Sequence, residues 1–248
     1  MRVTVDPANP VVSLCARGMR AEAAGRDAEA HDLFRLAWDT AADDYERCVA
    51  AHYVARHQPM PRETLRWNQE CLDRADLVAD DRVEGFHSSL HLNMAKAYGD
   101  LCEPGAAREH FERAAVHVRE APPGPYADAM RFAVAEGLRS AGATGPRPAD
   151  ELLTSLFAAL CRRGDLKALG LLLPAYLGDL GTDDDGIRLV TALHMVHAGR
   201  WLPEDEQRTL SRAIGSLTAA QDQDQDPEPD SESVPGSAGL HARNGSSG

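Results

Sequence analysis

Lysine and aromatic residues are scarce in this sequence. Of its 26 basic residues only Lys96 and Lys167 are lysines, and aromatic residues make up 5% of the 248 residues. A bias toward arginine and alanine of this strength is typical of a high-GC genome and favours a bacterial source. Patterns that alternate Val, Ile or Thr with polar residues are also nearly absent, so few strands are expected. Many alanines and leucines with few aromatics favour helices packed through small residues.

Long apolar segments and paired cysteines are also missing. No run reaches the 18 or so apolar residues of a membrane helix, and the opening MRVTVDPANP lacks the apolar centre of a secretory signal. The five cysteines are isolated, with no CxxC pair, which argues for reduced thiols rather than disulfides or a metal cluster. They are Cys15, Cys48, Cys71, Cys102 and Cys161. We therefore expect a soluble cytoplasmic protein.

Positive charge is in short supply, since 39 acidic residues against the 26 basic ones give a formal net charge of −13. Residues 221–248 contribute −5 of this charge, which leaves −8 on residues 1–220. A field of that sign repels phosphate groups. We therefore expect neither a nucleic acid nor a membrane as a partner.

Sequence motifs of common enzyme classes are absent as well. The chain contains no GxxxxGK[ST] or GxGxxG phosphate loop, no GxSxG nucleophile elbow and no HExxH metal motif. We accordingly predict no catalytic residue, no cofactor and no bound metal.

Apolar residues at helical spacing, separated by Pro and Gly, predict an all-α protein. Residues 166–177 are apolar nearly all round, so that helix is expected to be buried, and Pro174 to kink or split it. The predicted helices cover residues 11–24, 28–40, 43–57, 62–77, two helices between 83 and 118, and 126–140, 151–163, 166–177, 183–198 and 204–217. The predicted organisation is a leader (1–10), helical repeats with a capping helix (11–140), a C-terminal helical region (149–219) and a disordered acidic tail (220–248).

Small and aromatic residues recur along the first half at intervals of 34 and then 43 residues. The aligned sets are Ala30, Thr64 and Ala107; Phe34, Asn68 and Phe111; and Ala37, Cys71 and Ala114. Such a period indicates stacked helical hairpins. Residues 11–120 resemble the tetratricopeptide repeats. The third unit carries the resemblance at Ala95, Tyr98, Ala107, Phe111 and Ala114, and the first at Gly18, Gly25, Ala30, Phe34 and Ala37. The second unit, with His52, Pro59 and Asn68, is degenerate. A generic helical bundle is the alternative.

The resemblance implies a solenoid whose first helices line a concave groove for a peptide or a partner helix. The positions that line such a groove here include Cys15, Met19, Glu22, Glu46, Val49, Ser89, Leu92 and Asp100. Among them or beside them, Tyr53, Arg56, His57, Asn93 and Lys96 form the predicted partner-binding site, a small basic and aromatic patch suited to carboxylates and peptide backbone. Ordinary solvated helix residues are the other interpretation. Cys15 and Met19 stand where chaperone-binding members have Lys and Asn, which puts chaperone binding in doubt.

Three further clusters have plainer explanations. His87 and His91 have a metal-ligand spacing, yet two partly exposed surface histidines are the simpler interpretation. His194 and His197 are expected to be buried or half-buried in an apolar helix. Asp183, Asp184 and Asp185 are expected to cap a helix N-terminus.

These observations predict a non-catalytic scaffold that binds a protein or peptide in a concave groove. One alternative is a peptide-sensing regulatory partner protein, which would have to act through another chain. Another is an accessory helical enzyme that uses a cavity in residues 150–217. The apolar end of a short solenoid also favours homodimerisation.

Overall fold

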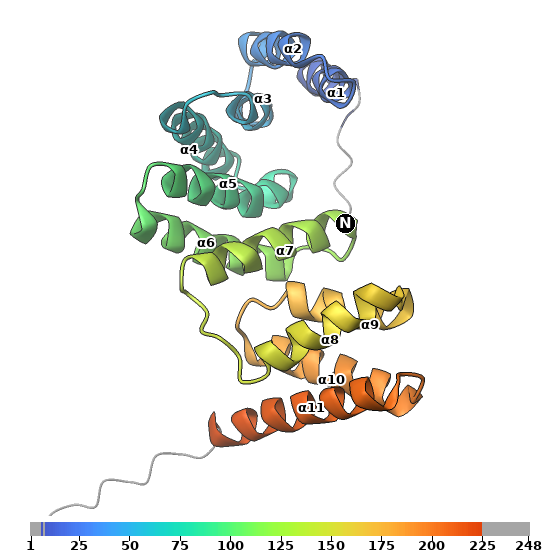
Figure 1. Ribbon diagram of the computed structural model, residues 1–248. Helices are drawn as coiled ribbons and strands as arrows, with labels where there is room; N and C mark the ends of the chain where they lie inside the picture. The colour runs from blue at the N-terminus through green and yellow to red at the C-terminus, as the bar shows by residue number, and fades with distance from the viewer. Residues whose placement is uncertain (1–5, 7, 225–248) are drawn as a thin grey trace, which may run out of the picture.

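The computed structural model describes residue 6 and residues 8–224, and this part of the chain is all helical, without a strand (Figure 1). The predicted fold class is therefore confirmed at the all-α level. Residues 1–5 and 7 of the predicted leader, and residues 225–248 of the predicted tail, lie outside the described residues. The helices are α1 (Pro10–Ala23), α2 (Asp27–Thr40), α3 (Asp44–Arg56), α4 (Pro61–Val78), α5 (Asp81–Asp100), α6 (Pro104–Glu120), α7 (Pro125–Ser140), α8 (Asp150–Arg163), α9 (Leu166–Leu177), α10 (Asp183–Gly199) and α11 (Glu204–Asp224).

Proline marks several helix starts. Pro10, Pro61, Pro104 and Pro125 each occupy the first turn of a helix, where the missing N–H is not needed by the helical hydrogen-bond ladder. Asn9 adds a side-chain cap, because its Oδ1 accepts from the first amides of α1. The helix starts predicted at these four prolines are thus confirmed. None of the described helices has the length and apolar character that a membrane crossing requires.

The first seven helices stack in chain order as antiparallel neighbours, from blue to yellow-green in Figure 1. Within this stack α1 contacts α3, α3 contacts α5 and α5 contacts α7. The described residues make no equivalent contact between α2 and α4 or between α4 and α6. The odd-numbered helices therefore lie closer together than the even-numbered ones.

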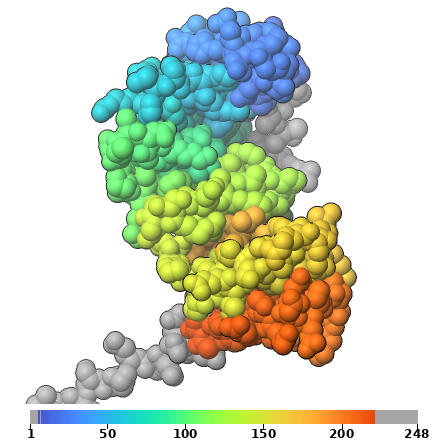
Figure 2. Space-filling model, viewed as in Figure 1, coloured from blue at the N-terminus to red at the C-terminus, as the bar shows by residue number. Residues whose placement is uncertain are grey.

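The last four helices form a closed bundle, since α8 contacts both α9 and α11, and α10 contacts both α9 and α11. Its core is rich in leucine, including Leu153, Leu160 and Leu193. Between stack and bundle, α7 and α9 are the described helices whose backbones approach each other most closely. The space-filling view shows the two parts adjoining in one elongated molecule (Figure 2).

The helix α9 runs through Pro174 to Leu177, so the proline does not split it. The expectation that this helix is buried was wrong. Only one side of it is buried, at Ala168, Leu169 and Leu172, while Leu166 is 78% exposed. The bundle covers a helix on one side only at this position, so apolar content alone overestimated its burial. The helix predicted to end at residue 217 instead continues to Asp224, into the region assigned to the tail.

Candidate functional site

The predicted site residues at the end of α3 are held in place by one buried ring. Phe34 of α2 is fully buried, and Tyr53 stacks on it with ring centroids 5.2 Å apart. The centroid of the His57 ring lies 5.1 Å from the centroid of the Phe34 ring. The guanidinium of Arg56 lies 5.8 Å from the centroid of Tyr53, within cation–π range. Tyr53, Arg56 and His57 are therefore brought together around the core of the first two hairpins.

The expected basic character of this patch is reduced by a carboxylate from α1. Nη2 of Arg56 donates to Oε1 of Glu22 at 2.7 Å, and Nε2 of His57 lies 3.6 Å from the same oxygen. Arg56 is exposed, so water screens much of this attraction. Even so, the patch is closer to a neutral, hydrogen-bonded cluster than to the positive site predicted from α3 alone.

Asn93 and Lys96 lie three residues apart on α5, the helix next to α3. Asn93 is half-buried and Lys96 is exposed. No hydrogen bond or ion pair within the described residues joins either side chain to Tyr53, Arg56 or His57. The structure thus places the five predicted residues on adjacent helices, in two separate groups.

Several other positions expected to line a groove are buried in the core. Cys15, Val49, Ser89 and Leu92 are each less than one tenth exposed, so they support the surface rather than form it. Met19 of α1 remains 39% exposed. The available surface is therefore narrower than predicted.

Tyr126, at the start of α7, adds an aromatic side chain that sequence reasoning missed. It is 63% exposed. The pKa of Tyr53 is raised, first by burial and then by neighbours that include Cys15 and Tyr126, with Arg56 acting in the opposite direction. Three helices, α4, α5 and α6, separate Tyr126 from Tyr53 in the chain. An aromatic residue directly after a proline break was the available signal.

A second unexpected feature is a histidine cluster between α5 and α6. Nδ1 of His91 lies 3.0 Å from Nδ1 of His110, and His87 stacks on His117 with centroids 5.0 Å apart. The ring of Tyr98 stacks on His110. His91 is buried, so the expectation of two partly exposed histidines at 87 and 91 was wrong for His91.

Burial and the neighbouring histidines lower the pKa of His91 to about 4. A neutral pair can share one N–H···N hydrogen bond between His91 and His110, whereas two charged rings would repel. Within the residues that the structure describes, no set of three or more His, Cys, Asp or Glu side chains is arranged to hold a metal ion. Burial also lowers the pKa of His110, so this ring favours its neutral form beside His91.

The expectation that the C-terminal histidines are buried or half-buried is confirmed for His197 and wrong for His194. His194 is exposed, and His197 is half-buried with Nε2 3.0 Å from Oγ of Ser211. The nearby pocket between α9 and α10, about 310 Å³ in volume, is lined by neither of them. Its lining is mainly apolar: Leu171, Pro174, Ala175, Ile187, Arg188, Thr191, Ala192 and Met195. His194 and His197 thus do not converge on this pocket.

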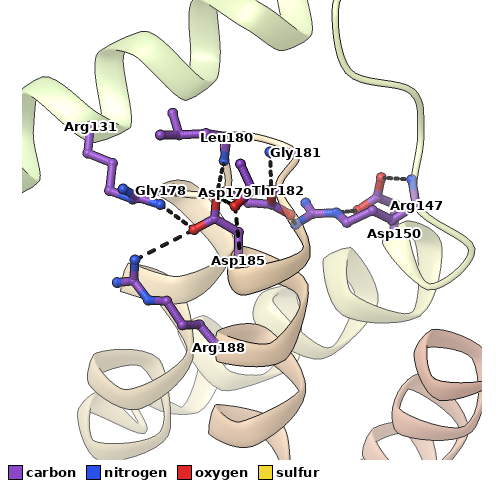
Figure 3. A network of polar contacts seen from close by, with 10 residues as sticks. All are labelled: Arg131, Arg147, Asp150, Gly178, Asp179, Leu180, Gly181, Thr182, Asp185 and Arg188. Atoms are coloured by element: carbon purple, nitrogen blue, oxygen red, sulfur yellow. Dashed lines mark hydrogen bonds and ion pairs between the residues drawn. The ribbon is translucent and has the colours of Figure 1, made fainter. Parts of the chain in front are cut away.

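The aspartate run at the start of α10 has divided roles (Figure 3). Thr182 is the N-cap, accepting from the backbone amide of Asp185, while Asp183 and Asp184 are exposed in the first turn. Asp185 is buried and does not cap the helix, which corrects the prediction for that residue. Its carboxylate instead pairs with Arg131 of α7 and accepts from the amide of Leu180. This contact joins the stack to the bundle.

The group at the end of α3 offers an aromatic face and a guanidinium, and the separate group on α5 offers an amide and an ammonium. No family model matches the chain, and no curated protein or solved structure shows significant similarity to it.

Proposed function

We propose that this chain is a non-catalytic interaction scaffold, in which α1–α6 act as three tetratricopeptide-like hairpins and α7 caps the third. The observation that carries the proposal is the pairing of alternate helices. Contacts link α1 to α3, α3 to α5 and α5 to α7, and the described even-numbered helices of the stack lack such contacts. A stack that is closer along one side curves toward that side, which makes the odd-numbered helices the inner face.

The proposed ligand is an extended peptide with an acidic and an apolar side chain. Lys96 has no carboxylate within ion-pair distance among the described residues, so its charge is available to a partner. Asn93, three residues earlier, can donate to and accept from a peptide backbone. Tyr53 and Tyr126 supply rigid contact area for the apolar side chain. Arg56 contributes less, because Glu22 competes for its guanidinium.

Selection of peptides from a random library on the full chain tests this proposal. Peptides enriched on the wild type should bind the Lys96→Glu variant at least about tenfold more weakly, equivalent to about 1.4 kcal/mol. The matched control is Arg62→Glu on α4, which reverses one exposed charge on an even-numbered helix. Its peptide affinity should remain unchanged.

Arg56 requires a paired design, because Arg56→Glu alone would set two carboxylates against each other. The double variant Glu22→Arg/Arg56→Glu keeps the ion pair with its direction reversed. We expect it to fold normally and to bind the selected peptides only a few times more weakly. The proposal fails if selection on folded wild-type protein enriches no peptide, or if Lys96→Glu and Arg62→Glu lower affinity equally.

A further inference from the structure

A pocket of about 320 Å³ lies at the joint between the stack and the bundle. Three segments line it: the end of α7 with Arg139, the connection to α8 with Thr144 and Arg147, and the turn before α10 with Asp179. Gly145 and Gly181 also contribute to the lining. The pocket therefore forms only when both parts of the molecule are assembled.

Three of its charged side chains satisfy one another (Figure 3). Arg147 donates from Nε to Oδ1 of Asp150 at 2.9 Å and from Nη1 to Oδ2 of Asp179 at 2.6 Å. Asp150 also accepts from the backbone amide of Arg147, and Asp179 from that of Gly181. These groups consequently have little capacity left for a ligand.

Arg139 differs from these three charged residues of the lining, because its charge is not paired in the part of the chain that the structure describes. No hydrogen bond or ion pair within the described residues involves its guanidinium, and its Nη1 is buried without an acceptor. Oγ1 of Thr144, which lines the same pocket, is likewise buried without a partner. A half-buried cation without a counterion is unfavourable, since burial removes part of its hydration. An oxyanion beside it would supply the missing acceptors.

We propose that this pocket binds a small organic monocarboxylate, with its carboxylate on the guanidinium of Arg139 and next to the hydroxyl of Thr144. The planar guanidinium fork matches the two oxygens of a carboxylate. A single negative charge fits best, because Asp150 and Asp179 share only one cation and would repel a second charge on the ligand. This site is independent of the peptide-binding face proposed above.

Titration of the full ¹⁵N-labelled chain with acetate, benzoate and inorganic phosphate tests the site by NMR. At millimolar concentrations a monocarboxylate should shift the backbone amides of Gly145 and Gly181, and phosphate should bind more weakly because about half of it carries a second negative charge at neutral pH. Arg139→Met should abolish these shifts. Arg162→Met, which removes an exposed arginine of α8, is the matched control and should leave them unchanged.

Two additional variants keep the test decisive if Arg139→Met does not fold. Arg139→Lys preserves the charge without the fork, and Thr144→Val removes the hydroxyl at similar volume; each should weaken binding several-fold. The proposal is overturned if neither monocarboxylate shifts the two glycine amides, if the Arg139 variants bind as the wild type does, or if phosphate binds more tightly than both carboxylates.

Discussion

The buried ring of Phe34 occupies the space that a side chain at Gly18 would need. A Cβ atom on Gly18 would lie 2.7 Å from Cδ1 of that ring, closer than real Cβ contacts allow. The same ring also packs against Tyr53 and His57. Close packing between α1 and α2 thus sets the position of two candidate site residues on α3.

Gly18→Ala should destabilise the protein through overpacking. Because Phe34 is fully buried, we expect the free energy of unfolding to fall by about 1–3 kcal/mol. Gly215→Ala on α11 is the control, since no heavy atom lies within 4 Å of its added Cβ. That change should raise stability by up to about 1 kcal/mol. Urea unfolding of both variants measures the difference, and equal effects would contradict the proposed role of the Phe34 contact.

Local sequence rules predicted the helices well because residues close by in the sequence determine where each helix starts and ends. Pro61, Pro104 and Pro125 start helices whatever lies far away in the chain, and Asn9 caps α1 through neighbouring amides. The spacing of Gly18, Phe34 and Ala37 likewise reflects packing within one hairpin. These features explain why the all-α class could be predicted from the sequence.

The site was less predictable because its chemistry depends on distant partners. Arg56 is paired with Glu22, 34 residues away, and Asp185 with Arg131, 54 residues away. His91 meets His110 across a hairpin. None of these pairings has a spacing signal, and each changes the charge or the burial that its residues would have alone. Hydrophobicity similarly overestimated the burial of α9, because it does not specify how many neighbours cover a helix.

Thiol reactivity should follow burial. Cys102 and Cys161 are exposed, while Cys15, Cys48 and Cys71 are buried. Burial raises the pKa of Cys15 to about 12. The pKa of Cys71 is also raised, first by its hydrogen bond with Cys48 and then by burial. Since the thiolate is the reactive species, the buried thiols should be inert in the native protein.

Ellman's reagent at mildly alkaline pH should therefore label the two exposed cysteines quickly, and the three buried ones only after unfolding in urea. A Cys102→Ser/Cys161→Ser variant should show no fast phase. Rapid labelling of a third thiol in the wild type would show that the core of the first two hairpins opens readily.

Acid should destabilise the stack through buried histidines. Burial, with a smaller contribution from Arg56, lowers the pKa of His52 from 6.5 to about 4. Above pH 6.5 the ring is neutral in both states, so it contributes no pH dependence. Below that value His52 binds a proton in the unfolded chain but stays neutral in the native state. The free energy of unfolding therefore falls progressively until about pH 4. His91 acts in the same direction.

For His52 the expected loss between about pH 7.5 and about pH 5 is about 2 kcal/mol. His52→Leu should reduce this loss, because Nδ1 of His52 has no hydrogen-bond partner and the ring lies against Tyr53 and Phe86. Urea unfolding of wild type and variant at both pH values gives the comparison. An identical pH dependence in the two proteins would exclude His52 as a source of acid sensitivity.

The contact of Asp185 with Arg131 should couple the bundle to the stack. Arg131 also donates from Nε to the carbonyl of Gly178 at 2.7 Å, and Asp185 accepts from Leu180 and from Oγ1 of Thr182. Asp185→Ala would leave a half-buried guanidinium and a buried amide without partners. We expect it to cost about 3–5 kcal/mol, whereas Asp184→Ala, at an exposed position in the same turn, should change stability by no more than about 0.5 kcal/mol.

Calorimetry should distinguish lost coupling from general destabilisation. The first hairpins and the bundle have separate cores. The two parts meet where α7 approaches α9, where Leu180 packs into the core of α5–α7 and where Arg131 pairs with Asp185. Asp185→Ala should therefore split one unfolding transition into two. With Trp38 and Trp67 replaced by Phe in both proteins compared, the fluorescence of Trp201 follows the bundle. Adding Arg131→Met should restore part of the stability, because removing both partners leaves no unpaired buried charge. A single transition in Asp185→Ala, with additive effects of the two changes, would show that this pair does not couple the two parts.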